Sequence, residues 1–217
     1  MARRSVTRAW DTVLLDLDGT LVDAGLEIAA GLRAALTEVG AAALDDVRLR
    51  SFVGPPLEES LSTLPGFDAS RVERTIAAYR RHYDMLASPV YDGIPESLCA
   101  LRDAGLRLAL ATSKPQRLAE AIVTHHGFDL EVVRGSLRDE GRVTKGDVVR
   151  AALDGLGSSQ RPVMVGDRSY DVRGSAEHGV PCVGVAWGYA DPADPGELAG
   201  ALTVVDSPAA LVAYLLG

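Results

Sequence analysis

The stretch Val13-Leu14-Leu15-Asp16-Leu17-Asp18-Gly19-Thr20-Leu21 decides the fold of this chain. Its apolar beginning predicts a strand over 12–16, and the Gly-Thr pair predicts a turn directly afterwards. Residues i and i+2 of a strand point to the same side, so Asp16 and Asp18 are expected to project together from the strand's end. Two carboxylates that close repel each other unless a cation or a shared proton relieves them. The pattern therefore indicates a magnesium site with one carboxylate free for chemistry, although two solvated acids at a strand end would give the same letters.

The composition allows one good-sized core, or a core with a smaller insert. The chain has 217 residues, of which 47% are hydrophobic, and a formal net charge of -8. This charge argues against nucleic acid or an anionic membrane as the main partner. The basic start 1–8 is followed by no signal-like apolar region, and no membrane span is expected. Cys99 and Cys182 are interpreted as reduced core residues, which fits a cytoplasmic location.

Strand-like apolar runs alternate with amphipathic helical patterns along the chain. This alternation is typical of an α/β fold with a parallel sheet whose strands are buried on both faces. The expected strands cover 12–16, 107–112, 131–135, 162–166, 181–186 and 202–205, and the expected helices between them cover 94–104, 115–126, 145–155, 171–178 and 208–215.

The interval between the first two strands is too long for a single crossover helix. Its excess, 23–90, has helical periodicity at 26–39 and 70–86, with a Gly-Pro-Pro break at 54–56 that opens a further helix. Ligands of open α/β sheets bind at the carboxyl ends of the strands, which is where this insert would lie. We therefore interpret it as a helical lid over the site and not as a second independent domain.

Three further motifs place polar groups at the same expected sheet edge. Thr112 and Ser113 end the second strand, where a hydroxyl and free N–H groups can hold a phosphate oxygen or simply cap a helix. Lys145 begins a helix, where a cation opposes the macrodipole, which suggests a purpose beyond solvation, although a lone surface Lys is usually just solvated. Asp167 and Asp171 follow a strand and indicate either a metal ligand with its neighbour or two helix-capping acids.

The combination is more specific than any of its parts. Asp-x-Asp-Gly-Thr, a strand ending in Thr, a Lys and Gly-Asp-x-x-x-Asp occur in this order, and the sequence thereby resembles the haloacid dehalogenase superfamily from about residue 10 onward. Val53-Gly54-Pro55-Pro56-Leu57 resembles the cap turn of the phosphoglycolate-phosphatase-like branch, and Tyr91-Asp92-Gly93-Ile94-Pro95 resembles its return into the core. The resemblance implies an α/β fold: a Rossmann-like three-layer core with a parallel sheet at 10–22 and 91–217, and a small all-helical cap at 23–90 inserted after the first strand.

The resemblance also implies roles for the residues that would act on the substrate. Asp16 matches the nucleophile that forms an aspartyl-phosphate, and Asp18 matches the general acid/base. Thr112 and the backbone N–H of Ser113 match the phosphate-binding motif. Lys145 matches the cation that offsets charge on the nucleophile and the phosphoryl group. Thr112 and Lys145 therefore belong to both the catalytic and the substrate-binding set.

The implied cofactor is Mg²⁺. Asp16 and Asp167 match direct ligands, Asp18 matches a ligand through its backbone carbonyl, and Asp171 matches a water-mediated or outer one. Gly54, in the cap turn, is the expected contact to the rest of the substrate. The expected partner is a small phosphorylated metabolite, with no nucleic acid or membrane, and the expected state is a monomer or a homodimer.

The implied function is Mg²⁺-dependent hydrolysis of a small phosphomonoester such as phosphoglycolate, a nucleotide or a sugar phosphate. A phosphomutase on the same scaffold stays open, and it would need a cap that holds a sugar phosphate while the sugar reorients. A 2-haloacid dehalogenase needs neither Mg²⁺ nor the second acid, so Asp18 argues against it. A catalytically silent binding module should have lost Asp16, Asp18 or Lys145, and all three are present.

Overall fold

A computed structural model of the chain describes residues 9–84, 86–158, 161–191, 194 and 196–217, so the basic start lies outside the described residues. Its centre is a six-stranded sheet in which every neighbouring pair of strands is parallel, as the sequence predicts. The strands are β1 (Thr12–Leu15), β2 (Arg107–Pro115), β3 (Val132–Ser136), β4 (Pro162–Gly166), β5 (Cys182–Val185) and β6 (Thr203–Val205).

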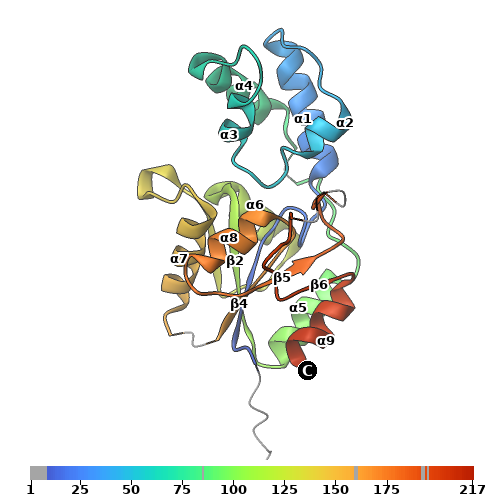
Figure 1. Ribbon diagram of the computed structural model, residues 1–217, viewed down its shortest axis with the longest axis vertical. Coiled ribbons are helices and arrows are strands. Elements are labelled where there is room, and N and C mark those ends of the chain that lie inside the picture. The colour runs from blue at the N-terminus through green and yellow to red at the C-terminus, as the bar shows by residue number, and fades with distance from the viewer. Residues whose placement is uncertain (1–8, 85, 159–160, 192–193, 195) are drawn as a thin grey trace, which may run out of the picture.

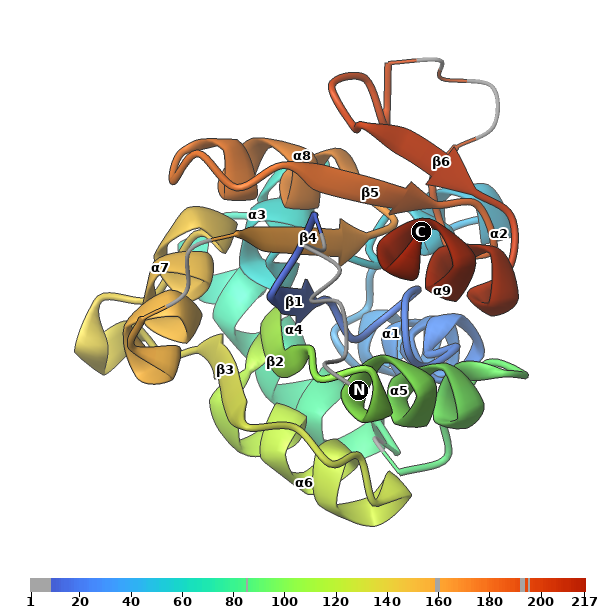
Figure 2. The same cartoon turned by 90° about the horizontal axis from the view of Figure 1, so that it is seen from below.

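Helices cover both faces of the sheet and make three layers (Figure 2). Alternate residues of β1 enter the two layers of core: Val13 and Leu15 pack on one side, and Leu14 packs on the other. All four residues of the strand are buried, because helices cover both of its faces. One face carries α5 (Ile94–Asp103), α6 (Gln116–His126) and α9 (Pro208–Leu216), and the other carries α7 (Lys145–Leu156) and α8 (Ser169–Ala176).

The strand order β3-β2-β1-β4-β5-β6 places a switch point between β1 and β4. From β1 the chain builds outward through β2 to β3, and then returns across the sheet by α7 to start β4 on the other side of β1. Crevices at such points, outside the carboxyl ends of the strands, are the ligand sites of open α/β sheets. Asp16 directly follows β1 and Asp167 directly follows β4, so both lie at this crevice.

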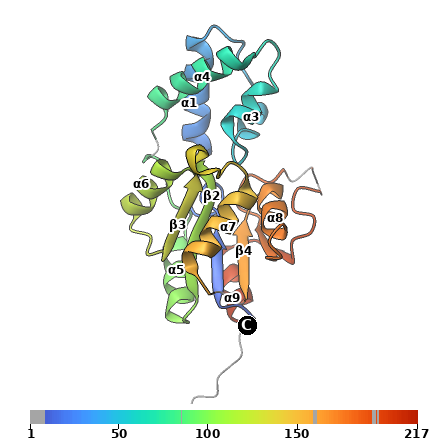
Figure 3. The ribbon, with the colours of Figure 1, turned by 90° about the vertical axis from the view of Figure 1, so that its left-hand side faces the viewer.

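Four helices after β1 lie over the carboxyl ends of the strands (Figures 1 and 3). They are α1 (Gly25–Glu38), α2 (Asp46–Arg50), α3 (Leu57–Ser62) and α4 (Ala69–His82), and we call them the cap. Gly31 lets α1 approach α4 closely, because a Cβ there would lie 3.1 Å from the ring of Tyr79. The cap is joined to the core by two adjacent segments, where Asp23 N–H donates to the carbonyl of Pro89 at 2.8 Å.

Several predicted boundaries are wrong by a few residues. The helix predicted over 70–86 ends at His82, because Tyr83 adopts an extended conformation with ψ 113°. Strand β2 runs to Pro115, three residues past the predicted end at Thr112. A short 3-10 helix, η1 (Arg138–Glu140), follows β3 and was not predicted.

Cys182 is buried as predicted, but Cys99 is exposed and free. Helix α5 turns Leu98 and Leu101 to the core, and Cys99 lies off that face. Within the described part of the chain, no helix combines the length and apolar character that crossing a bilayer requires.

Candidate active site

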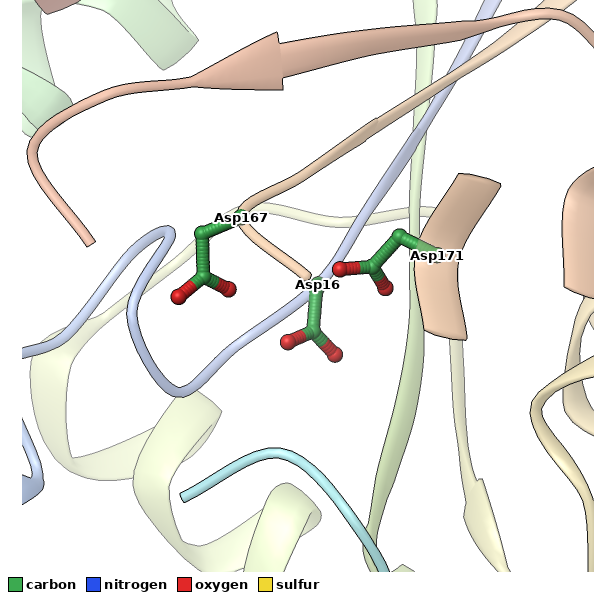
Figure 4. Close-up of side chains that lie close together, drawn as sticks. All are labelled: Asp16, Asp167 and Asp171. Atoms are coloured by element: carbon green, nitrogen blue, oxygen red, sulfur yellow. The ribbon is translucent and has the colours of Figure 1, made fainter. Parts of the chain in front are cut away.

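Three buried acids meet at the switch point of the sheet. Each of Asp16, Asp167 and Asp171 offers a carboxylate oxygen, and these oxygens all lie within 4.8 Å of one another. Figure 4 shows Asp16 between the other two. Asp16 follows β1, Asp167 follows β4, and Asp171 lies in the first turn of α8. We call these three residues the acid group.

Lys145 is the counter-charge of the acid group. Its Nζ lies 2.5 Å from Oδ1 of Asp16 and 2.6 Å from Oδ1 of Asp171. Lys145 is the first residue of α7, whose start is fixed by a capping box between Thr144 and Asp147. Burial alone would lower the pKa of the Lys145 ammonium, but the two carboxylates outweigh burial and raise it. The ammonium therefore stays charged beside the Asp16 carboxylate.

The acid group carries more negative charge than its surroundings compensate. Burial raises the pKa of Asp167 well above its usual range, although the N–H of Tyr189 donates to this carboxylate at 2.7 Å. Burial also raises the pKa of Asp171 to about 6. A divalent cation would favour the ionised form of both acids, and carboxylate oxygens are the ligands that Mg²⁺ prefers. The donor set therefore fits a magnesium ion.

Glycines allow the backbone to close around the acid group. A Cβ on Gly19 would lie 2.2 Å from Oδ2 of Asp167, and one on Gly188 would lie 2.4 Å from the same oxygen. Gly19 also has a φ of +85°, which side chains rarely adopt. Replacement of either glycine would therefore displace the carboxylate of Asp167.

The carboxylate of Asp18 lies outside the acid group. Regular strand alternation does not reach it, because β1 ends at Leu15 and the chain then turns, with Leu21 N–H donating to the carbonyl of Leu17 at 2.8 Å. Asp18 instead accepts hydrogen bonds from Nζ of Lys114 at 2.9 and 2.7 Å. Burial raises the pKa of Asp18, and the neighbouring ammonium only partly offsets this effect.

Sequence reasoning assigned no role to Lys114, which is buried and connects the core to the cap. Besides Asp18 it contacts the cap, because its Nζ donates to the hydroxyl of Tyr83 at 2.8 Å. Burial alone would lower the pKa of Lys114, but the carboxylate of Asp18 raises it. The residue follows Thr112 and Ser113 directly, so the signal was present. The predicted strand ends at Thr112, whereas β2 continues to Pro115 and carries Lys114 to the same sheet edge.

The predicted phosphate-binding residues lie beside Asp18. Thr112 is buried, and its Oγ1 accepts from the N–H of Lys114 at 3.3 Å. Ser113, Asp18 and Gly54 line one cavity between core and cap. The structure thus brings the acid group together with Lys145, and places Asp18, Ser113 and Gly54 on one cavity. Thr112 is not among the described residues that line this cavity, and it is tied to the cavity through its contact with Lys114.

Gly54 takes its position from a contact between cap and core. Its φ is +107°, and a Cβ there would lie 3.0 Å from Cγ of Arg168. The guanidinium of Arg168 donates to the carbonyl of Val53 and is held by Glu197 at 2.8 Å. The cap turn therefore rests on a side chain from the loop that carries Asp167.

A sequence profile of the haloacid dehalogenase-like hydrolases matches residues 13–185, well over half of the chain. The chain belongs to this family. The predicted resemblance is thereby confirmed, and the order of strands and the position of the cap follow the expected fold.

Several named proteins are similar to this chain. The chain is 42% identical over 183 residues to the tyrosine-protein kinase PtkA of Mycobacterium tuberculosis, covering 82% of this chain and 62% of PtkA, so it spans less than two thirds of that relative's length. A solved structure of PtkA matches with a TM-score of 0.82 at 38% identity, over 95% of this chain and 98% of that one. A 5'-nucleotidase of Pseudomonas aeruginosa is 36% identical over 86% of this chain and 87% of its own length. A plasmid-encoded phosphoglycolate phosphatase of Cupriavidus necator is 34% identical over 94% of this chain and 92% of its own length.

Proposed function

We propose that this protein is a Mg²⁺-dependent phosphomonoesterase that hydrolyses a small phosphorylated metabolite through an aspartyl-phosphate on Asp16. One observation carries the proposal: the Asp16 carboxylate lies against the Lys145 ammonium and two further buried acids at the switch point of the sheet. Membership of the hydrolase family and similarity to a nucleotidase and a phosphoglycolate phosphatase support this reaction.

The first step forms the phosphoenzyme. A carboxylate oxygen of Asp16 attacks phosphorus, the ester P–O bond breaks, and Asp18 gives its proton to the departing alkoxide. The raised pKa of Asp18 favours the protonated form that this step needs. Thr112, the N–H of Ser113 and Lys145 hold the phosphoryl oxygens and offset their charge.

The second step returns the enzyme to its starting state. Asp18, now a carboxylate, takes a proton from water as the water oxygen attacks phosphorus. The bond between Asp16 and phosphorus breaks, and inorganic phosphate leaves. One aspartate therefore acts as acid and then as base, so the proton count balances over the cycle.

The residues that would hold Mg²⁺ are Asp16 and Asp167 directly, Asp171 through water or from outside, and the main-chain carbonyl of Asp18. Bound there, the cation supplies charge compensation for the phosphoryl oxygens. The buried, mutually close carboxylates of the acid group support this assignment.

We further propose that 23–90 is the cap unit and that 10–22 with 91–217 is the catalytic core. The working enzyme is a monomer or homodimer in the cytoplasm, without nucleic acid or membrane as partner. The negative net charge supports the statement on nucleic acid and membrane, and the two free cysteines support the cytoplasmic location.

The test measures phosphate release from acetyl phosphate and p-nitrophenyl phosphate with Mg²⁺ and after exhaustive dialysis against EDTA. Turnover should require the cation and return when it is restored, and excess Ca²⁺ should inhibit because its looser coordination disturbs in-line geometry. Full activity in EDTA would contradict the metal assignment.

Three further substrates, each with its own product, separate the alternative functions. Halide release from 2-chloropropionate would indicate a dehalogenase, and isomerised sugar phosphate without free phosphate would indicate a phosphomutase. Because one relative is named a tyrosine-protein kinase, ATP is supplied with a tyrosine-containing peptide. Transfer to the peptide in place of release to water would overturn hydrolysis as the function.

A further inference from the structure

The cavity between core and cap has a volume of ≈ 190 Å³ and opens beside the catalytic residues. Asp18 and Ser113 form its core-side end. Under the proposed function Asp18 protonates the leaving oxygen, so the alcohol part of the substrate must lie where Asp18 can reach it. On that function, which this inference assumes, the cavity is the site for the leaving group.

The cap side of the cavity is aromatic and apolar. The rings of Tyr79 and Tyr83 are stacked, with centroids 5.0 Å apart and planes at 16°. Burial raises the pKa of both hydroxyls, so the rings are neutral. Beside them the cavity is lined by Phe52, Leu57 and Ile76. A flat apolar group would gain both buried area and aromatic contact against this wall.

The cations of the cavity already have partners or are exposed. Lys114 is bound to Asp18 and Tyr83, and Arg138 forms an ion pair with Glu58 across the seam between core and cap. Arg80 also lines the cavity but is exposed to solvent. A short leaving group with a carboxylate, such as glycolate, would reach the Lys114 ammonium beside Asp18 and would have to compete with Asp18 for it. This competition argues against such a leaving group.

The volume limits the size of the group. Sites for drug-sized ligands usually measure about 300–1,000 Å³, and ≈ 190 Å³ is below that range. We propose that the preferred substrate is a phosphate monoester whose leaving group carries one planar aromatic ring, held against Tyr79 and Tyr83. Phenolic phosphates such as O-phosphotyrosine and pyrimidine nucleoside monophosphates share this chemistry.

The decisive comparison uses benzyl phosphate and cyclohexylmethyl phosphate, because both release a primary alcohol and differ mainly in ring aromaticity. We expect kcat/KM to favour benzyl phosphate by about 3- to 10-fold, mostly through KM. Tyr79→Leu and Tyr83→Leu should bring this ratio close to one. Tyr79→Phe and Tyr83→Phe should keep it, and so should Tyr214→Leu, which removes an exposed tyrosine on α9.

Binding without turnover gives a second measurement. Calorimetry with Mg²⁺ present should show tighter binding of benzylphosphonate than of cyclohexylmethylphosphonate, including in Asp16→Asn, and the preference should vanish in Tyr79→Leu. Loss of fold in the leucine variants would be seen as a lost thermal transition, and the phosphonate pair measured on the wild type and on Asp16→Asn then decides the outcome.

Acetyl phosphate separates the two proposals, because it has no ring. Equal kcat/KM for the two ring substrates, with acetyl phosphate still hydrolysed, would overturn the aromatic site and leave the phosphatase intact. No hydrolysis of any phosphate would overturn both. A comparison of O-phosphotyrosine with uridine monophosphate then shows where the ring lies. A higher kcat/KM for O-phosphotyrosine would place the ring directly on the ester oxygen, and a higher kcat/KM for uridine monophosphate would place it one ribose away.

Discussion

The two sides of the active-site cavity are built in different ways. On the core side, functional groups occur directly after strands or at the first residue of a helix: Asp16 follows β1, Asp167 follows β4, and Lys145 begins α7. On the cap side, Tyr79 and Tyr83 come from one face and the end of a long helix. Under the proposed function, backbone topology places the groups that act on phosphorus, whereas side-chain packing on the cap selects the leaving group. Changes on the core side should be severe and independent of substrate, and changes on the cap side mild and dependent on it.

The largest effect is expected from Asp16→Asn on the core side. The amide is nearly isosteric but is not a competent nucleophile, so kcat should fall by at least about 1,000-fold while the fold survives. Asp103→Asn, an exposed acid at the end of α5, is the matched control and should keep wild-type turnover. More than about one hundredth of wild-type kcat in Asp16→Asn would contradict the nucleophilic role.

Asp18→Asn tests the boundary between the two sides. A poor alkoxide leaving group needs the proton of Asp18, whereas p-nitrophenolate leaves well without it, so phosphorylation of Asp16 should be much faster with p-nitrophenyl phosphate than with an alkyl phosphate. With its base also absent, the variant should stall after a burst of about one nitrophenolate per enzyme, with a mass gain of roughly 80 Da. Equal slowing of both substrates without a phosphoenzyme would show that Asp18 is not the acid/base.

Lys145→Met and Lys114→Met compare the two buried lysines directly. Lys145 compensates the acid group, so its loss should lower the free energy of unfolding of the metal-free protein by about 3–5 kcal/mol, and Mg²⁺ should restore part of it. Lys114 pairs with Asp18 and Tyr83 outside that group, so Mg²⁺ should restore less. Urea denaturation with and without Mg²⁺ measures both. If Mg²⁺ restored the free energy of unfolding of both variants equally, the proposed difference between the two lysines would be wrong.

The metal-free protein should lose stability as the pH rises through the range set by Asp171. Burial raises the pKa of this acid from 3.8 to about 6, so in that range the folded protein holds a proton that the unfolded chain has released. The contribution is therefore full below pH 3.8 and lost as the pH passes about 6, and it amounts to roughly 1–3 kcal/mol. The difference between wild type and Asp171→Asn in urea denaturation isolates it, and Mg²⁺ should abolish it. The free energy of unfolding of the wild type should fall relative to that of Asp171→Asn as the pH rises, and a rise of the wild type relative to the variant would contradict this prediction.

The smallest expected effect is closure of the cap. Backbone amides along the seam between core and cap, near Gly54 and Tyr83, should exchange a few-fold more slowly when Mg²⁺ and vanadate are bound, while amides of β1 stay unchanged. Tyr83→Phe removes the hydroxyl that accepts from Lys114 and should weaken this protection. Hydrogen exchange followed by mass spectrometry measures it. Identical protection with and without vanadate would argue against a closing cap.

The sequence predicted the core well because each core motif is local. An apolar run followed by Asp16, or by Asp167, reports a buried strand and its carboxyl end at once. The partner of Asp18 could not be predicted in the same way, because Lys114 lies 96 positions along the chain and meets it only through parallel pairing of β1 and β2. The early end of α4 was equally hidden, since Tyr83 continues the helical spacing while its backbone leaves the helix.

The paired junction between cap and core has a consequence for changes in the insert. Asp23 N–H donates to the carbonyl of Pro89 at 2.8 Å, Tyr91 N–H donates to that of Leu21 at 3.1 Å, and Val22 pairs with Val90. The two segments that connect the core to the insert therefore lie side by side and pair like the two strands of a short hairpin. An insert of another length or fold can begin and end at the same ladder without disturbing the parallel sheet. A change in the insert at this junction would therefore leave the places of Asp16 and Asp167 at the ends of β1 and β4 unaltered.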